Sequence, residues 1–336
     1  MQLRIALVLL LSVATHAANS TCFPLGGAKF SGSKPSMDRN DWWCGNDRMY
    51  GFLGFSYPME EGCGSSTSYD HISKDMQRMK KDYGATFVRT YLTTCRDVSV
   101  YKNLVKAGRD NNMGVIPMLF WDFGPNDKLM KQAENALLAV FQDAEVGKFA
   151  PYVIHSVAFG DELGEEGQYW MKPFNDLKAK LAKYGVPLTI SDDWDRGEYK
   201  SGNSLSNWGK QVRDAVALTH VHIQGYYHPG AVPNARAHFN YLKGQVNFMK
   251  NNNIKRPYII SQTLWTSGKG GHAFRGNVDN MDNFSAFWND MQNNCQYFKQ
   301  EKVSYFFHAW SDGGEAPLGL LKNNGQAKIS FRPQRC

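Results

Sequence analysis

Several features that define common protein classes are missing from this chain. After the first residues, no segment approaches the roughly 20 consecutive apolar residues that a membrane helix needs. No hydrophobic tail of the kind that signals a lipid anchor is present either. There is no Cys-x-x-Cys pair and no Cys/His cluster, so a zinc site is not indicated. We therefore expect no metal and no association with a membrane.

Nucleotide and nucleic-acid binding also lack their usual sequence patterns. No glycine-rich phosphate motif of the G-x-G-x-x-G or Walker type follows the first predicted strand, and we expect no cofactor. The formal net charge is +7, or 7 − 1 = +6 without Arg4. No basic run interleaved with aromatic residues stands out, so nucleic acid is not an expected partner.

The N-terminus has the pattern of a secretory signal. Arg4 supplies the positive charge, residues 5–13 are apolar, and small residues around 15–18 offer a cleavage site. We predict that residues 1–18 are removed and that the protein is secreted, to the extracellular space or the cell wall. Residues 19–49 would form an N-terminal extension, and residues 50–336 one barrel whose C-terminal tail is tethered by a disulfide.

Six cysteines remain after this cleavage, which is an even number in an exported chain and therefore indicates disulfides. They allow about 15 connectivities, and the sequence alone does not distinguish them. The cysteines are Cys22, Cys44, Cys63, Cys95, Cys295 and Cys336.

Segments typical of strands and helices alternate along the chain. The predicted strands are residues 50–57, 86–92, 115–120, 153–159, 187–190, 220–226, 258–261 and 303–309. The predicted helices are residues 71–83, 98–111, 127–141, 168–184, 208–218, 235–251 and 281–299. This alternation, without a domain linker, favours an α/β fold of the (β/α)8 TIM-barrel type over a doubly wound sheet. We expect a monomer.

Two of these apolar runs end abruptly in polar side chains. The run 157–159 is followed by Gly160-Asp161-Glu162, and Ile259-Ile260 is followed by Ser261-Gln262. In a barrel, strand C-termini and the loops after them build the site. Besides Glu162 and Gln262, these ends carry Tyr57, Arg89, Tyr91, Trp121, Asp122, Asp161, Asp193, Trp194, Tyr227, Trp265, His308, Trp310 and Asp312.

This mixture of carboxylates, amides and aromatic rings suits a carbohydrate ligand. Aromatic faces pack on sugar C–H surfaces, and carboxylates and amides hydrogen-bond to sugar hydroxyls. Structural roles compete with this interpretation. An aromatic residue near a strand end can belong to the core, Asp161 and Asp193 can be helix N-caps, and Arg89 can hold a buried carboxylate. Glu162 is the hardest to explain structurally, since a charge that ends a buried strand needs a site or an ion pair.

Several stretches resemble the family 17 glycoside hydrolases, which are β-1,3-glucanases and β-1,3-glucanosyltransferases. They are residues 54–57, 87–91 with Cys95, 157–162, 260–265 and 307–312, so the resemblance spans about 50–312. The resemblance implies a retaining glycosidase barrel in which Glu162 is the acid/base and β-glucan is the partner. It places Gln262 where the family has its nucleophilic glutamate, His308 at a second family glutamate, and Leu264 at a glycine.

Three hypotheses follow from Gln262, because an amide is a poor nucleophile and retaining enzymes need two carboxyl groups. The first is a pseudoenzyme that binds β-1,3-glucan without cleaving it. The second is an active hydrolase or glucanosyltransferase whose second carboxylate is displaced to Asp193, Asp312 or Asp122. The third is substrate-assisted cleavage of an N-acetylated sugar, which lacks the alternating aspartates expected before Glu162. The mechanism favours the first, with weak or lost hydrolysis.

Overall fold

The computed structural model describes residues 21–59, 62–91, 94–120, 128–166, 169–268, 278–313 and 316–336. The predicted signal segment, residues 1–18, and two predicted site residues, Trp121 and Asp122, lie outside these ranges. Among the described residues, none of the helices combines the length and the apolar character that crossing a membrane requires.

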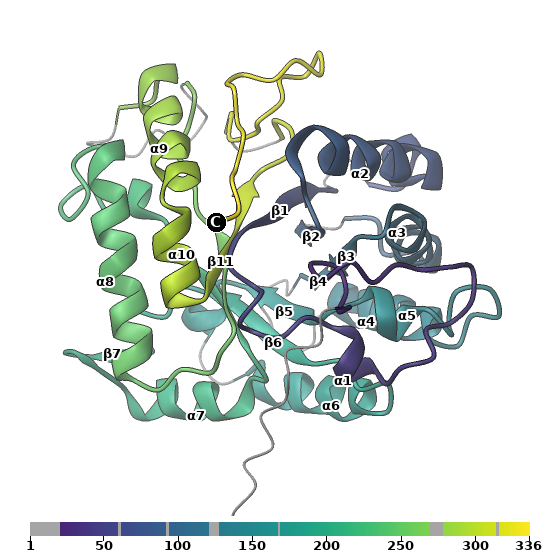
Figure 1. Cartoon of the computed structure of the whole chain (residues 1–336). Coiled ribbons are helices and arrows are strands. Elements are labelled where there is room, and N and C mark those ends of the chain that lie inside the picture. The colour runs from purple at the N-terminus through teal and green to yellow at the C-terminus, as the bar shows by residue number, and fades with distance from the viewer. Residues whose placement is uncertain are drawn as a thin grey trace, which may run out of the picture.

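The described strands form a barrel of parallel strands, which confirms the predicted (β/α)8 fold. Around the barrel the order is β3-β2-β1-β11-β10-β9-β6-β5-β4. The two ends of this order, β3 and β4, are halves of one strand, so the barrel returns to its start. Figure 1 shows the helices arranged around the outside of the strands. The bounds are β1 Gly51–Pro58, β2 Phe87–Tyr91, β3 Gly114–Ile116, β4 Met118–Leu119, β5 Val157–Asp161, β6 Leu188–Asp192, β9 Thr219–His222, β10 Tyr258–Gln262 and β11 Val303–His308.

The helices follow from amphipathic patterns with recognisable ends. In α2, Ile72, Met76 and Met79 are buried along one face, Ser68 caps the first turn, and Gly84 ends the helix in the left-handed conformation. The helices are α1 Arg39–Trp42, α2 Tyr69–Tyr83, α3 Val98–Asn111, α4 Lys128–Val140, α5 Ala150–Val153, α6 Met171–Ala182, α7 Asn207–Ala215, α8 His238–Asn251, α9 Met281–Asn293 and α10 Cys295–Glu301. A short hairpin, β7 Lys200–Ser201 and β8 Ser204–Leu205, precedes α7.

Four predicted elements differ from the structure. The third strand is interrupted at Pro117, which has no N–H to donate to the ladder. The fourth strand begins at Val157, not at residue 153, because residues 150–153 form the short helix α5, with Pro151 in its first turn. The sixth strand ends at His222, four residues earlier than predicted. The predicted helix 281–299 is divided at Asn294 into α9 and α10.

The barrel interior changes from apolar to polar along its axis. Near the N-terminal ends of the strands, Leu53, Phe87, Ile116, Ile259 and Phe306 form one buried cluster. Further toward the C-terminal ends the buried side chains are hydroxyl, imidazole and guanidinium groups. They include Ser56, Arg89, Ser191, His222 and Ser261. Barrel interiors are usually filled by branched apolar residues, so this polar layer points toward a site at the C-terminal ends.

The residues before β1 close the opposite end of the barrel. Trp43 stacks on Phe87, with ring centroids 5.9 Å apart, and meets His155 edge-on at 4.9 Å. Trp42 donates its indole N–H to the carbonyl of Tyr152 at 2.8 Å. Phe87 begins β2, and Tyr152 and His155 lie just before β5, so the N-terminal extension closes the end of the barrel away from the predicted site.

All six cysteines form disulfides, as their even number in an exported chain predicts. The pairs are Cys22–Cys44, Cys63–Cys95 and Cys295–Cys336. The last pair fixes the final residue of the chain at the start of α10. The carbonyl of Cys336 also accepts a hydrogen bond from the Tyr50 hydroxyl at 2.7 Å. Because Tyr50 directly precedes β1, the C-terminus also lies at the closed end of the barrel.

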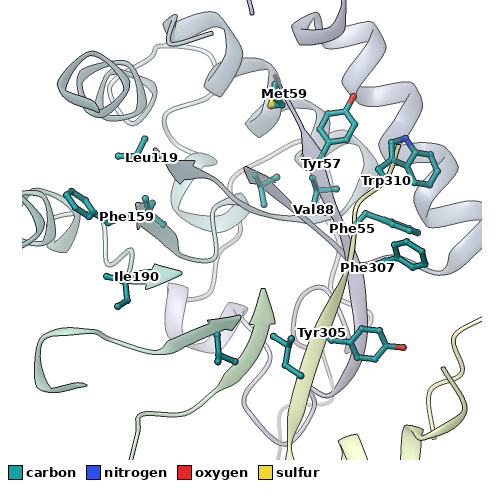
Figure 2. Packing of buried hydrophobic residues seen from close by; sticks show 14 of the residues in the cluster. Phe55, Tyr57, Met59, Val88, Leu119, Phe159, Ile190, Tyr305, Phe307 and Trp310 are labelled. Carbon is teal, nitrogen blue, oxygen red and sulfur yellow. The ribbon is translucent and has the colours of Figure 1, made fainter. Parts of the chain in front are cut away.

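The main apolar core lies between the strands and the surrounding helices. Figure 2 shows side chains of this cluster, among them Phe55, Phe159, Ile190 and Phe307, on the outer faces of their strands. The same cluster contains Tyr57 and Trp310. Because successive strand residues point to opposite faces, these outward positions leave the neighbouring residues to face the interior.

Candidate carbohydrate site

The end of β5 is a bulge that turns two adjacent carboxylates toward the same partner. Gly160 has φ = 68°, the register with β6 shifts between Phe159 and Asp161, and Glu162 has φ = 58°. Adjacent side chains of a regular strand point to opposite faces. Here Asp161 lies 3.3 Å from Nε2 of His222, and Glu162 lies 3.3 Å from Nδ1 of the same ring. A left-handed φ at a glutamate is a costly conformation that tends to occur at functional sites.

Asp161 has several hydrogen-bonding and charged partners in the barrel interior. Its Oδ1 atom accepts from Arg89 Nη2 at 3.3 Å, and the Gln262 amide approaches Oδ1 and Oδ2 at 3.0 and 3.1 Å. Burial acts against the charged form, but His222, Arg89 and Gln262 outweigh it and lower the pKa of Asp161 to about 2. Asp161 is therefore ionised at neutral pH, with its lone pairs already committed to protein donors.

The amide of Gln262 is complementary to its surroundings. Its nitrogen donates to Asp161, and its oxygen accepts from Gln224 Nε2 at 2.8 Å. A carboxylate at this position could accept from Gln224 but would stand beside the negative charge of Asp161. The surroundings of residue 262 are therefore matched to an amide.

Glu162 is held between two cationic groups. Its Oε2 atom is 2.7 Å from Arg196 Nη2, and its Oε1 atom is 3.3 Å from His222 Nδ1. Burial favours the neutral carboxyl, but the hydrogen bond from His222 prevails, helped by Arg196, and the pKa of Glu162 is lowered. A general acid works best with a raised pKa near the working pH. In this arrangement Glu162 is a carboxylate and an acceptor.

His222 connects the two carboxylates and was not among the predicted site residues. It is fully buried, and although burial disfavours its charge, Asp161 and Glu162 raise its pKa to about 9. An imidazolium between two carboxylates keeps both of them ionised. The signal that could have found it is the alternation His220-Val221-His222 in β9, which places both histidines on one face.

Arg196 is the second residue that the sequence did not reveal. It follows β6 in a loop and bridges Glu162 to Asp192, with Nε 3.2 Å from Asp192 Oδ1. Asp192 also accepts from the Tyr199 hydroxyl at 2.7 Å and from the backbone N–H of Gly164 at 2.8 Å. These contacts attach Arg196 and, through it, Glu162 to the rigid end of β6.

Four other predicted residues lie at or just after the C-terminal ends of strands, as this cluster does. Tyr91 and His308 are ring neighbours, with centroids 4.7 Å apart, and burial near Arg89 lowers the pKa of His308 to about 3. Asp193 lies 3.7 Å from His228 Nε2. Asp193 directly follows β6 and stands at the start of the loop whose Arg196 holds Glu162. Tyr227 is half-buried and packs on Tyr226.

The remaining described candidates point elsewhere. Trp194 packs on Tyr199, and Trp265 packs on Tyr226, both as fully buried rings. Trp310 packs against Phe55 and Tyr83, whereas the hydroxyl of Tyr57 donates to Asp75 on α2 at 2.8 Å. Asp312 pairs with Lys328 near the C-terminus. These residues sit at strand ends, but the structure does not bring them to the Glu162–Gln262 cluster.

A set of potential metal-ligand atoms occurs at Cys63, Cys95 and Asp97. Its two sulfurs form a disulfide with each other, so they are not free to bind a metal as thiolates. The carboxylates of the barrel interior are paired with arginine, histidine and amide groups. The described site therefore offers hydrogen-bonding groups for a polar organic ligand and no ready set of metal ligands.

The structural neighbours of this chain are glycoside hydrolases with barrel folds. An endo-laminarinase from Formosa Hel1_33_131 matches with a TM-score of 0.61 and 17% identity, over 82% of this chain and 84% of its own. A GH2 beta-galacturonidase from Eisenbergiella tayi matches with 0.56 and 11%, over 83% and 49%. A beta-glucuronidase from Bacteroides uniformis matches with 0.58 and 13%, over 83% and 34%. The chain thus spans half or less of the length of the last two.

No model of a protein family matches the sequence, and no curated protein matches it. The identities to the solved structures are low, so the likeness is one of fold. The chain has the barrel architecture of these glycoside hydrolases.

Proposed function

We propose that this protein is a secreted, family-17-like barrel that recognises β-1,3-glucan of cell walls through the site around Glu162 and Gln262. Hydrolysis is weak or lost. The observation that carries this proposal is the amide of Gln262, which is held between Asp161 and Gln224, at the residue that the sequence resemblance assigns to the second carboxyl group of a retaining enzyme. Glu162, paired with Arg196 and His222, supports the same conclusion because it is an ionised acceptor.

The choice of glucan has two supports. The sequence segments that carry the resemblance include the strand ends that form this site. The neighbour with the TM-score of 0.61 is described as an endo-laminarinase, and laminarin is therefore the first polymer to test. Three disulfides fit a secreted protein. A monomer remains our proposal for the assembly.

The first experiment measures binding and product release together. The secreted protein is titrated with laminarin and defined β-1,3-gluco-oligosaccharides, with Glu162→Gln, Gln262→Glu and the exchange Asp161→Asn/Gln262→Glu as companions. We expect the wild type to bind with little or no product. The exchange variant should gain turnover, because it moves the carboxylate to position 262 while leaving one negative charge for Arg89 and His222.

Gln262→Glu alone is the matched comparison and should gain less than the exchange variant. The introduced carboxyl group would face Asp161. Two carboxyl groups at hydrogen-bonding distance do not both ionise readily. Absence of both binding and turnover in the wild type would show that β-1,3-glucan is the wrong ligand.

A second function has one specific observation in its favour. Asp193, paired with His228, borders the loop that holds Glu162, whereas Asp312 is paired with Lys328. Asp193 is therefore the displaced carboxylate to test if the wild type releases or elongates oligosaccharides. In that case Glu162→Gln and Asp193→Asn should each abolish turnover, and Asp312→Asn should not.

A further inference from the structure

A cavity lies outside the barrel wall. It has a volume of about 630 Å³ and lies between the end of β1, helix α2 and the residues that follow β11. Tyr57, Asp75, Arg78, Trp310 and Asn323 contribute to its lining. Figure 2 shows Tyr57 and Trp310 on the outer side of β1 and β11, away from the barrel axis. The lining does not include the residues of the Glu162–Gln262 cluster, so this is a separate site.

The charged groups on the α2 side of the cavity are already balanced by protein partners, whereas Lys322, which also lines the cavity, is exposed and has no ion pair among the described residues. Asp75 Oδ2 accepts from the Tyr57 hydroxyl at 2.8 Å and lies 3.4 Å from His71 Nε2. The guanidinium of Arg78 lies 3.5 Å from Asp82 and 5.5 Å from the ring centroid of Trp310, and it donates to the carbonyl of Gly325 at 2.9 Å. A charged ligand would have to disrupt one of these pairs to reach Asp75 or Arg78, so this side of the cavity favours a neutral ligand.

Hydrogen-bonding capacity nevertheless remains at the cavity. Both contacts of Asp75 use Oδ2, and Oδ1 has no partner among the described residues. Asn323 lies on an exposed segment and adds a side-chain amide that can both donate and accept. Sugar hydroxyls also donate and accept, which matches this combination of carboxylate, amide and phenol. The volume falls within the roughly 300–1,000 Å³ of small-molecule sites.

We propose that this cavity is a second carbohydrate site, which binds one or two units of a neutral saccharide independently of Glu162 and Gln262. The proposal rests on the proposed function only in its choice of a sugar as the ligand. The carboxylate of Asp75 and the amide of Asn323 hold the hydroxyls, and Tyr57 and Trp310 form the floor.

The test is calorimetric titration of the whole secreted protein with the β-1,3-linked disaccharide and hexasaccharide of glucose. We expect two binding events per chain. Asp75→Asn and Asn323→Ala should each weaken one event at least tenfold, and Gln262→Ala should weaken only the other. Asn323→Ala lies on the surface, so it remains informative if the helix variant folds poorly. Asp70→Asn removes the same charge from the exposed start of α2, outside the cavity, and should change neither event.

The outcomes separate this proposal from the function proposed for the barrel. A single event that Gln262→Ala removes and the cavity variants leave intact overturns the second site alone. A single event that only the cavity variants weaken supports the second site and overturns the role of the barrel interior. Absence of any binding overturns both.

Discussion

At the residue scale, the decisive feature is the contact between Gln262 and Asp161. We predict that Gln262→Glu destabilises the protein by about 2–4 kcal/mol at pH 8, because it buries a second negative charge beside Asp161. Asp161 raises the folded-state pKa of the introduced carboxyl group. The loss is therefore small below about pH 4, where this group is protonated in both states, grows between the ordinary glutamate pKa of about 4.3 and the raised folded-state pKa, and is complete above the latter.

Guanidinium unfolding of the variant and the wild type at pH 5.5 and pH 8 measures this difference. The exchange Asp161→Asn/Gln262→Glu is the control and should recover most of the lost stability, since it restores one carboxylate and one amide. Equal stability of Gln262→Glu and the wild type at pH 8 would contradict the conclusion that Asp161 makes a second carboxylate at residue 262 unfavourable.

At the element scale, the approach of β1 to β2 depends on Gly54. A Cβ atom at this position would lie 1.8 Å from the carbonyl oxygen of Phe87 on the neighbouring strand. We predict that Gly54→Ala costs about 3 kcal/mol or more or prevents folding, since strand backbone cannot yield as a flexible side chain does. Thermal unfolding and the yield of folded protein measure the effect.

Gly84, at the end of α2, is the matched control for Gly54. It has φ = 69°, and no atom would meet a Cβ there within 4 Å. Gly84→Ala should therefore cost only about 1 kcal/mol, from the left-handed conformation alone. Similar losses for both variants would show that the close approach of the two strands is not what makes Gly54 necessary.

The elements also show which parts of the structure the sequence can predict. Helix α3 occupies the predicted residues 98–111, because its apolar periodicity and its ends are local properties. The sequence pattern predicts too early a start for β5, because a short segment such as 153–159 is compatible with either a helical turn or a strand. The bulge at Gly160 leaves no comparable local pattern.

The same division applies to the site. Glu162, Gln262, Asp161 and Arg89 were predicted as a group because each stands at a strand end, and they do meet in the barrel. The partner that joins them, His222, depends on which face of β9 points inward and on how far each strand is shifted along its neighbours. These are properties of the closed barrel, so strand ends alone did not predict it.

At the scale of the whole molecule, buried histidines make stability depend on pH. Burial lowers the pKa of His155, His238 and His308 to about 3 each, and that of His220 well below its ordinary value. These rings stay neutral in the folded protein but take up protons near pH 6.5 when unfolded. Their contribution is present above about pH 6.5 and is lost as the pH falls.

We therefore predict that the free energy of unfolding falls below pH 6. The four rings contribute a limiting slope on the order of 5 kcal/mol per pH unit, and burial, which raises the pKa of Asp192 to about 7 and that of Asp195 to about 6, reduces the net slope to roughly half of this. Chemical unfolding between pH 7 and pH 5 measures this slope, which reports the number of protons taken up. A slope equivalent to less than one proton would contradict the burial of these rings as neutral groups. His222 acts in the opposite direction, because its pKa is raised to about 9, and its contribution is lost between about pH 6.5 and pH 9.

Both ends of the described chain lie at the closed end of the barrel, near the N-termini of the strands. The segment that begins at Thr21 packs under the strands through Trp42 and Trp43, and Cys336 is held beside Tyr50. A tag, a solid support or a second module joined at either end would therefore attach behind the barrel. The end of the barrel that carries Glu162 and Gln262 would then face away from the attachment point. The protein can therefore be immobilised through its termini without obstructing a long polymer.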